Sequence, residues 1–114
     1  MTALPPDPLA RGIAAYGRDL RAGKTTAEAA TQAYLTRIKA LDPKLGAFQL
    51  VMGKQALTAA KAVDKLLAAG TDLGPLMGVP VAVKDLFAIE GTKAHAGTKL
   101  DVADLIGEEG SFVK

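Results

Sequence analysis

The stretch from Gly74 to Lys99 constrains the fold of this chain more than any other part of its sequence. It surrounds a short apolar run, Val79–Val83, with prolines and glycines, and that run ends in Lys84-Asp85. So short a valine-rich run, bounded by turn-forming residues, is typical of a buried strand rather than a helix. The sequence therefore predicts a lysine at the end of a buried strand.

The chain begins with a proline-rich lead-in, residues 1–7, and then predicts a first helix. Asp7-Pro8 is a typical helix start, and apolar residues recur from there on one helical face. Gly23 is a typical residue for the position just after a helix. We therefore expect the first helix between these two signals.

Two more helices are predicted further along the chain. The second runs from the capping box Thr25-Thr-Ala-Glu28 to about Ala40, because the proline of Asp42-Pro43 disfavours helix in the residue before it. Residues 47–52 form an apolar run of strand length, and Gly53–Ala69 follows as the third helix. The residues predicted to face the core are Leu9, Ile13, Tyr16, Leu20, Ala30, Tyr34, Ile38, Leu41, Ala56, Ala60, Val63 and Leu67.

The composition limits the classes of partner. A chain of 114 residues allows one domain at most. Hydrophobic residues make up 49% but aromatic residues only 4%, which suits helices packed on a larger body. A net charge of +2, without a long Lys/Arg cluster or interleaved aromatic residues, argues against nucleic acid as a partner. The longest apolar runs are too short to span a membrane, and no signal peptide is evident, so we expect a cytoplasmic protein.

Metal and cofactor chemistry is not expected. The sequence has no cysteine, and its one histidine, His95, has no second histidine or ligand-spaced carboxylates near it. The glycine-rich pattern matches neither the P-loop nor the dinucleotide-binding motif. We therefore predict neither a metal site nor a cofactor.

Lys84 is the main candidate for chemistry. Burial disfavours the ammonium, so a lysine at the end of a buried strand can act as a base. An ion pair with Asp85 at the rim of a sheet is the competing interpretation, and periodicity alone favours it. Met77 is predicted to pack under its loop or to face a substrate, and His95 to lie at the surface or contact a substrate.

Nearly the whole chain resembles a known protein family. Its most specific part is Gly74-Pro-Leu-Met-Gly-Val-Pro-Val-Ala-Val-Lys-Asp85, followed by Gly91 and Ala96-Gly-Thr-Lys99. Upstream, two helices, a turn into a strand at Leu41–Phe48 and an Ala- and Lys-rich helix follow in the same order. These features resemble the amidase signature family of serine hydrolases.

The resemblance implies a Ser–Ser–Lys triad with Lys84 as its lysine. In that chemistry the neutral amine accepts the proton of a bridging serine, which takes it from a nucleophilic serine. The nucleophile attacks an amide carbonyl, and water hydrolyses the resulting acyl-enzyme. The resemblance therefore changes the preferred interpretation of Lys84 from an ion pair to a catalytic base.

The sequence departs from the family pattern in two places. Ser111 is the only serine, and its context is unlike the Gly/Ser-rich segment that holds the family's nucleophile. We therefore expect residues 1–114 to be the N-terminal part of a single amidase domain whose remainder supplies both serines. Ala94-His95 stands where many members carry threonines, which makes His95 a candidate specificity residue.

The expected fold class is α/β. Residues 8–70 form N-terminal helices, and the stretch 74–99 carries Lys84 and contributes to the first strands of a mixed sheet that this chain leaves incomplete. We expect the isolated chain to be inactive and to be stable only with the remainder of the amidase polypeptide.

The leading interpretation of function is hydrolysis of a small-molecule amide by the complete enzyme. One alternative is the glutamine-hydrolysing subunit of a tRNA-dependent amidotransferase, a branch that Ala94–Thr98 fits less well. The other is a non-catalytic interaction module, because no nucleophile motif is present in these residues.

Overall fold

The chain divides into two units, Met1–Pro80 and Val81–Lys114. The computed structural model describes residues 4–48 and 50–80 of the first unit and residues 81–83 of the second. The helices in the described residues are α1 (Ile13–Arg21), α2 (Ala27–Leu45) and α3 (Gly53–Ala68). None of the three combines the length and apolarity needed to cross a membrane.

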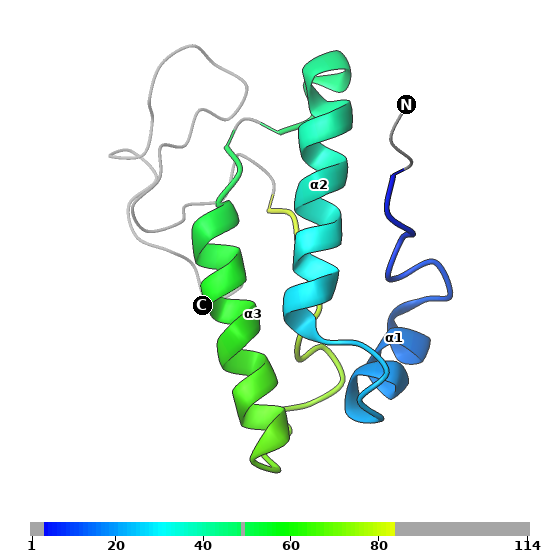
Figure 1. Cartoon of the computed structure of the whole chain (residues 1–114), viewed down its shortest axis with the longest axis vertical. Helices are drawn as coiled ribbons and strands as arrows, with labels where there is room; N and C mark the ends of the chain where they lie inside the picture. The colour runs from blue at the N-terminus through cyan, green and yellow to red at the C-terminus, as the bar shows by residue number, and fades with distance from the viewer. Residues whose placement is uncertain (1–3, 49, 84–114) are drawn as a thin grey trace. The chain divides into compact units, whose positions relative to one another are not determined.

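Helices α2 and α3 lie side by side and run in opposite directions, and α1 packs beside the N-terminal half of α2 (Figure 1). Small side chains at the contacts allow the helices to approach closely. The buried core consists of Tyr16, Leu20, Ala27, Ala30 and Ala60. Partly buried residues that pack against it are Leu9, Val63, Leu67 and Val79, so the segment after α3 also contributes to the core.

Helix α1 begins later than the sequence predicts. Asp7 does not cap it: its carboxylate accepts a hydrogen bond from the Leu9 amide at 2.9 Å and forms a separate turn. Gly12 then adopts a φ of 94°, which interrupts helical geometry, and the helix begins at Ile13. The predicted stop is confirmed, since Gly23 has a φ of 75° directly after the C-cap.

The N-terminus of α2 is capped from two sides. Its N-cap is Thr26, one residue after the predicted one, and the Thr26 side chain accepts a hydrogen bond from the Ala29 amide at 3.0 Å. Asp64 of α3 accepts hydrogen bonds from the amides of Ala27 at 2.7 Å and Glu28 at 3.0 Å. The predicted capping box is therefore wrong: a carboxylate from another helix takes its place.

The predicted end of α2 near Ala40 is also wrong. The helix continues through Pro43 to Leu45, and Gly46 ends it with a φ of 60° and an amide bonded to the Asp42 carbonyl at 2.7 Å. A proline so close to the C-terminal end of a helix removes a single backbone hydrogen bond. The residue before a proline disfavours helical geometry, but this is a preference, and in α2 it does not end the helix.

Helix α3 agrees closely with its prediction. It ends at Ala68, one residue before the expected Ala69. Gly70 follows with a φ of 88°, and its amide donates to the carbonyl of Leu67 at 3.0 Å. The sequence signal here, a glycine just past the last apolar position, is the ordinary helix stop.

Neither predicted strand is present among the described residues. Of residues 47–52, the amides of Ala47 and Phe48 donate to the side chain of Asp42 instead of to a neighbouring strand. Residues 79–83 are not part of a strand, and Val81 is 80% exposed rather than buried. A strand needs the backbone of a partner, and the described residues provide none. They are therefore helical, and the α/β class stays a prediction.

Candidate functional site

The predicted site lies only partly within the described residues. Lys84 and His95 lie outside them, so their roles stay predictions. The structure describes the segment that leads to Lys84, and we call residues 72–80, all in the first unit, the signature loop.

The signature loop consists of two successive turns. The amide of Met77 donates to the carbonyl of Gly74 at 3.1 Å, and the amide of Val79 donates to that of Leu76 at 3.1 Å. Pro75 has the fixed φ that favours the second position of a turn. Gly78 has a φ of 83°, in the region that favours glycine.

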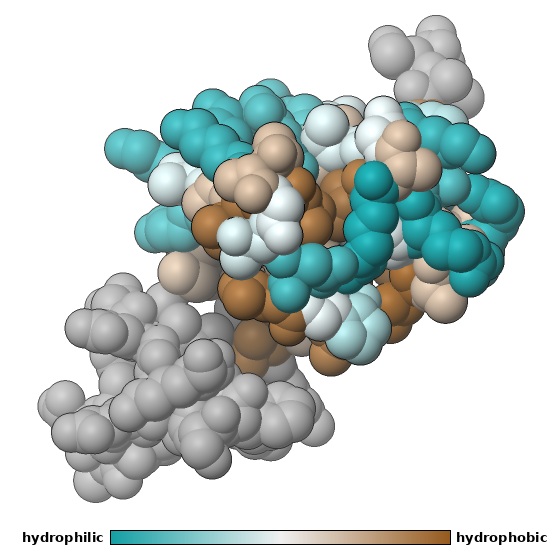
Figure 2. Space-filling view, turned by 90° about the horizontal axis from the view of Figure 1, so that it is seen from below, coloured by the Kyte–Doolittle hydropathy of each residue, from teal (hydrophilic) through white to brown (hydrophobic). Residues whose placement is uncertain are grey.

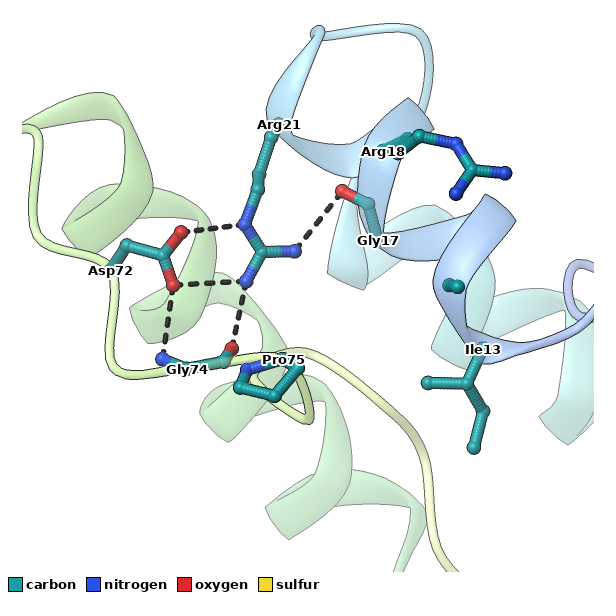
Figure 3. Close-up of a pocket in the computed structure, with 8 residues that line it drawn as sticks. Ile13, Gly17, Arg18, Arg21, Asp72, Gly74 and Pro75 are labelled. Carbon is teal, nitrogen blue, oxygen red and sulfur yellow. Dashed lines mark hydrogen bonds and ion pairs between the residues drawn. The ribbon is translucent and has the colours of Figure 1, made fainter.

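Arg21 of α1 anchors the beginning of this loop (Figure 3). Its guanidinium contacts the Asp72 carboxylate with both ends, Nε to Oδ2 at 2.5 Å and Nη2 to Oδ1 at 2.9 Å. Nη2 also donates to the carbonyl of Gly74 at 2.7 Å, and Nη1 donates to that of Gly17 at 3.1 Å. The arrangement uses the planar fork of arginine to join a helix, a carboxylate and a loop carbonyl.

The Arg21–Asp72 pair changes the acidity of both groups. The hydrogen bond from Arg21, and then the one from the Gly74 amide at 3.0 Å, lower the pKa of Asp72 to about 2. The same pair raises the pKa of Arg21. Both side chains are partly exposed, so solvent screens their attraction and the value of the pair lies in its geometry.

Tyr16 of α1 anchors the other end of the loop. Its side chain is 2% exposed, and its hydroxyl donates to the carbonyl of Gly78 at 2.7 Å. Burial, and then the negative charge of Asp64, raise the pKa of Tyr16. Gly78 lies so close to the core that a Cβ added there would come within 2.7 Å of Leu20 Cδ2. The loop backbone is therefore part of the helical core at this point.

Two open pockets adjoin the signature loop. The first, about 500 Å³, lies between α1 and the loop and is lined by Ile13, Ala14, Gly17, Arg18, Arg21, Asp72, Gly74 and Pro75 (Figure 3). The second, about 400 Å³, is more apolar and is lined by Val63, Leu66, Leu73, Gly74, Pro75, Leu76, Met77 and Gly78. Apolar side chains reach the surface between hydrophilic ones on the face seen in Figure 2.

Met77 lines the second pocket and is half-buried. Its sulfur accepts a hydrogen bond from the amide of Leu73 at 3.2 Å, which ties it to its own loop. Its contact with a substrate stays a prediction. Among the described residues, no cluster of three or more His, Cys, Asp or Glu side chains could hold a metal ion.

The sequence patterns do not predict the roles that three residues have in holding the signature loop. Arg21 stands out only as a basic residue near the end of a helix, Asp72 lies in no motif, and Tyr16 belongs to the core face without a partner. One signal is available: a buried tyrosine on an apolar stripe needs an acceptor for its hydroxyl. Which carbonyl provides it depends on the fold, because Tyr16 and Gly78 are 62 residues apart in sequence.

Comparison with known proteins relates the chain to amidases and to a subunit of an amidotransferase. A family model described as Amidase matches residues 29–114. One subunit of the glutamyl-tRNA(Gln) amidotransferase of Acidothermus cellulolyticus is 49% identical over 81 residues, which are 71% of this chain and 16% of that protein. The protein with the same name from Thermobifida fusca is 46% identical over 87 residues, 76% of this chain and 18% of that protein.

The chain thus spans less than a fifth of the length of the curated relatives that it matches. The protein of the same name from Salinispora arenicola gives the same proportion, at 49% identity over 78 residues, 68% of this chain and 16% of its own length. No solved structure matches the chain.

Proposed function

The chain belongs to the amidase family, and we propose on this basis that it forms the N-terminal part of an enzyme that hydrolyses carboxylic amides. The observation that carries the proposal is the family match over residues 29–114, a range that includes the signature loop and Lys84. The fold of the complete enzyme would be α/β, with α1–α3 on the outside of a mixed sheet.

Lys84 acts as the general base in the proposed mechanism. Its neutral amine accepts a proton from a bridging serine, which accepts one from the nucleophilic serine. The nucleophile attacks the amide carbonyl carbon, the C–N bond breaks, and the amine leaves with a proton. Water then hydrolyses the acyl-enzyme. Both serines would come from parts of the enzyme outside residues 1–114, because Ser111 has no Gly/Ser-rich context.

The test is the substitution Lys84→Ala in the complete enzyme. Removal of a general base typically lowers turnover by about 10²- to 10⁴-fold. Lys65→Ala is the matched control, because Lys65 is an exposed lysine of α3 and should leave turnover unchanged. Release of ammonia or amine is measured, and circular dichroism checks that both variants are folded. Undiminished amide turnover in Lys84→Ala would refute the mechanism.

The names of the relatives favour a more specific candidate, in which the amide is that of glutamine. Three of them are named as the same subunit of a glutamyl-tRNA(Gln) amidotransferase. Ala94–Thr98, the segment that fits this branch less well in the sequence, argues in the other direction. Comparison of kcat/KM for glutamine with that for simple aliphatic and aromatic amides decides between the two.

An interaction module without catalysis makes a different prediction. A serine-directed fluorophosphonate probe would label no protein in a preparation of such a module. Labelling of the complete enzyme, or of a chain that co-purifies with residues 1–114, would support the amidase instead.

A further inference from the structure

We propose that Met77 is an oxidation-sensitive site, at which a peroxide converts the thioether to the sulfoxide and thereby loosens the signature loop. All of the groups involved lie in residues 63–78 of the first unit, so the site is independent of Lys84 and of the proposed amide hydrolysis. The modification is of a reversible kind, because dedicated enzymes reduce methionine sulfoxide to methionine.

Met77 closes the signature loop with its side chain as well as with its backbone. Its sulfur accepts a hydrogen bond from the Leu73 amide at 3.2 Å, and its own amide donates to the carbonyl of Gly74 at 3.1 Å. Both bonds are local and hold residues 73–77 together. A thioether sulfur is a weak acceptor, so the bond from Leu73 is the more easily lost of the two.

The sulfur of Met77 lies where a small oxidant can reach it. Met77 is half-buried and lines the open pocket of about 400 Å³ beside the signature loop. Leu73 and Leu76 line the same pocket and are 75% and 67% exposed, so the pocket opens to solvent. These 114 residues contain no cysteine, so their three methionines are the sulfur groups available to a peroxide.

The reaction transfers one oxygen atom to the sulfur. A lone pair of the sulfur attacks an oxygen of hydrogen peroxide, and the O–O bond breaks as the S–O bond forms. The departing hydroxide takes the proton of the transferred oxygen and leaves as water. The sulfur is oxidised by two electrons and the peroxide is reduced by two. The flexible apolar side chain of Met77 thereby becomes a polar one.

Oxidation removes the acceptor of the Leu73 amide from either side of the sulfur. An oxygen added toward the amide has no room, because nitrogen and sulfur are only 3.2 Å apart. An oxygen added on the other side leaves the sulfur with a partial positive charge, which no longer accepts a hydrogen bond. A polar group beside Val63 and Leu66 also costs free energy unless it is hydrogen-bonded. We therefore expect the sulfoxide to leave the pocket and the turn to open.

The experiment separates Met77 from Met52 in the complete protein. Met52, the N-cap of α3, is also half-buried, but its sulfur accepts no hydrogen bond among the described residues. Met52→Leu leaves Met77 to be oxidised, Met77→Leu leaves Met52, and both substitutions keep an apolar side chain of similar size. Each protein is treated with hydrogen peroxide. Mass spectrometry of tryptic peptides locates the sulfoxides, because Lys54 and Lys65 lie between the two methionines.

Amide hydrogen exchange reports on the signature loop before and after the treatment. In Met52→Leu we expect peroxide to speed exchange at positions 73, 77 and 79 by about 10-fold, since these amides close the loop. In Met77→Leu the same treatment should leave the three amides unchanged. Methionine sulfoxide reductase should restore slow exchange in Met52→Leu, which distinguishes a reversible modification from general oxidative damage.

A second pair of variants tests the polarity of the side chain without an oxidant. Met77→Gln keeps nearly the length of methionine and adds a polar end like that of the sulfoxide. We expect it to speed exchange at position 77 about as much as peroxide does. Met52→Gln is its control and should leave exchange at position 77 unchanged.

Three results would overturn the proposal. Met77 that stays unoxidised at a peroxide concentration that oxidises free methionine would show that the pocket is closed in the complete protein. Full oxidation of Met77 with unchanged exchange at positions 73, 77 and 79 would show that the sulfoxide does not open the turn. An acceleration of equal size in Met77→Leu would assign the effect to another site.

Discussion

Two connecting segments, one between α2 and α3 and one after α3, are held in place in different ways. The α2–α3 connection, residues 46–52, is fixed by a side chain of the helix that it leaves: Asp42 accepts hydrogen bonds from the amides of Ala47 and Phe48. The signature loop is fixed by residues that are distant in sequence, Tyr16 and Arg21 of α1. One connection therefore depends on local contacts and the other on the tertiary fold.

The two connections also differ in what they contribute to the molecule. The α2–α3 connection reverses the chain, and its apolar side chains remain at the surface, with Leu50 58% exposed and Val51 43%. The signature loop contributes Val79 to the core and leads to the segment that carries Lys84. The long-range anchors are therefore found in the connection that belongs to the signature motif.

The strongest test of this contrast compares one glycine from each connection. Gly78→Ala places a Cβ within 2.7 Å of Leu20 at a φ of 83°, which combines backbone strain with overpacking. We expect it to lower the free energy of local unfolding by about 2–4 kcal/mol. Gly46→Ala has a φ of 60° but open space around the Cβ, and should lower it by about 1 kcal/mol.

Hydrogen exchange measures both effects. The amides of Met77 and Val79, which close the turns of the signature loop, report on Gly78→Ala, and the amide at position 46 reports on Gly46→Ala. An effect of equal size in the two variants would mean that the signature loop is no more closely packed than the α2–α3 connection.

A smaller effect is expected for Asp42→Ala in the α2–α3 connection. The substitution removes the acceptor of two backbone hydrogen bonds at an exposed site, which should reduce stability by about 1 kcal/mol. Because the contact is local, exchange should increase at Ala47 and Phe48 and stay unchanged at Met77. Faster exchange throughout the signature loop would show that the two connections are coupled.

The smallest effect is a dependence on pH that belongs to the signature loop. Asp72 has a pKa of about 2 in the folded chain and an ordinary value of 3.8, so its pair with Arg21 contributes fully above about pH 4. That contribution decreases as the pH falls toward 2, because protonation of the carboxylate is then favoured in the unfolded state first. Urea denaturation should show a shallower decrease over this window in Asp72→Asn.

Asp7 also contributes to the dependence of stability on acid pH, in the wild type and in Asp72→Asn alike. Its pKa is also lowered, chiefly by the hydrogen bond from Tyr34, and it is present in both proteins. The remaining dependence in Asp72→Asn therefore includes Asp7. An unchanged slope in Asp72→Asn would mean that the Arg21–Asp72 pair contributes nothing measurable to stability.

The helices were predictable from sequence where the signal was local. The glycine stops after α1 and α3 were found because a glycine follows the last apolar position. The start of α2 is predicted to within one residue, but its capping partner Asp64 is not, because Asp64 lies on another helix. Pro43 indicates a helix end near Ala40, but the helix continues to Leu45 and ends at Gly46.

The candidate site was predictable only as a motif. The run that ends in Lys84 indicated the family, and the family model agrees over residues 29–114. The anchors of the loop could not be found in this way, because Tyr16 and Gly78 become neighbours only after α1 has packed on α2 and α3. Hydrogen bonds between a side chain and a distant backbone carbonyl leave no periodic pattern in a sequence.

The cap that Asp64 provides has a consequence for the order in which the chain folds. The first turn of α2 obtains two of its backbone partners from a residue 37 positions downstream of Ala27. During synthesis on the ribosome, all residues of α2 are therefore made before Asp64, which accepts hydrogen bonds from its first turn. Thr26 caps the Ala29 amide locally, but we expect the amides of Ala27 and Glu28 to lack these partners until α3 has emerged and docked, so that the two helices become stable together as one hairpin.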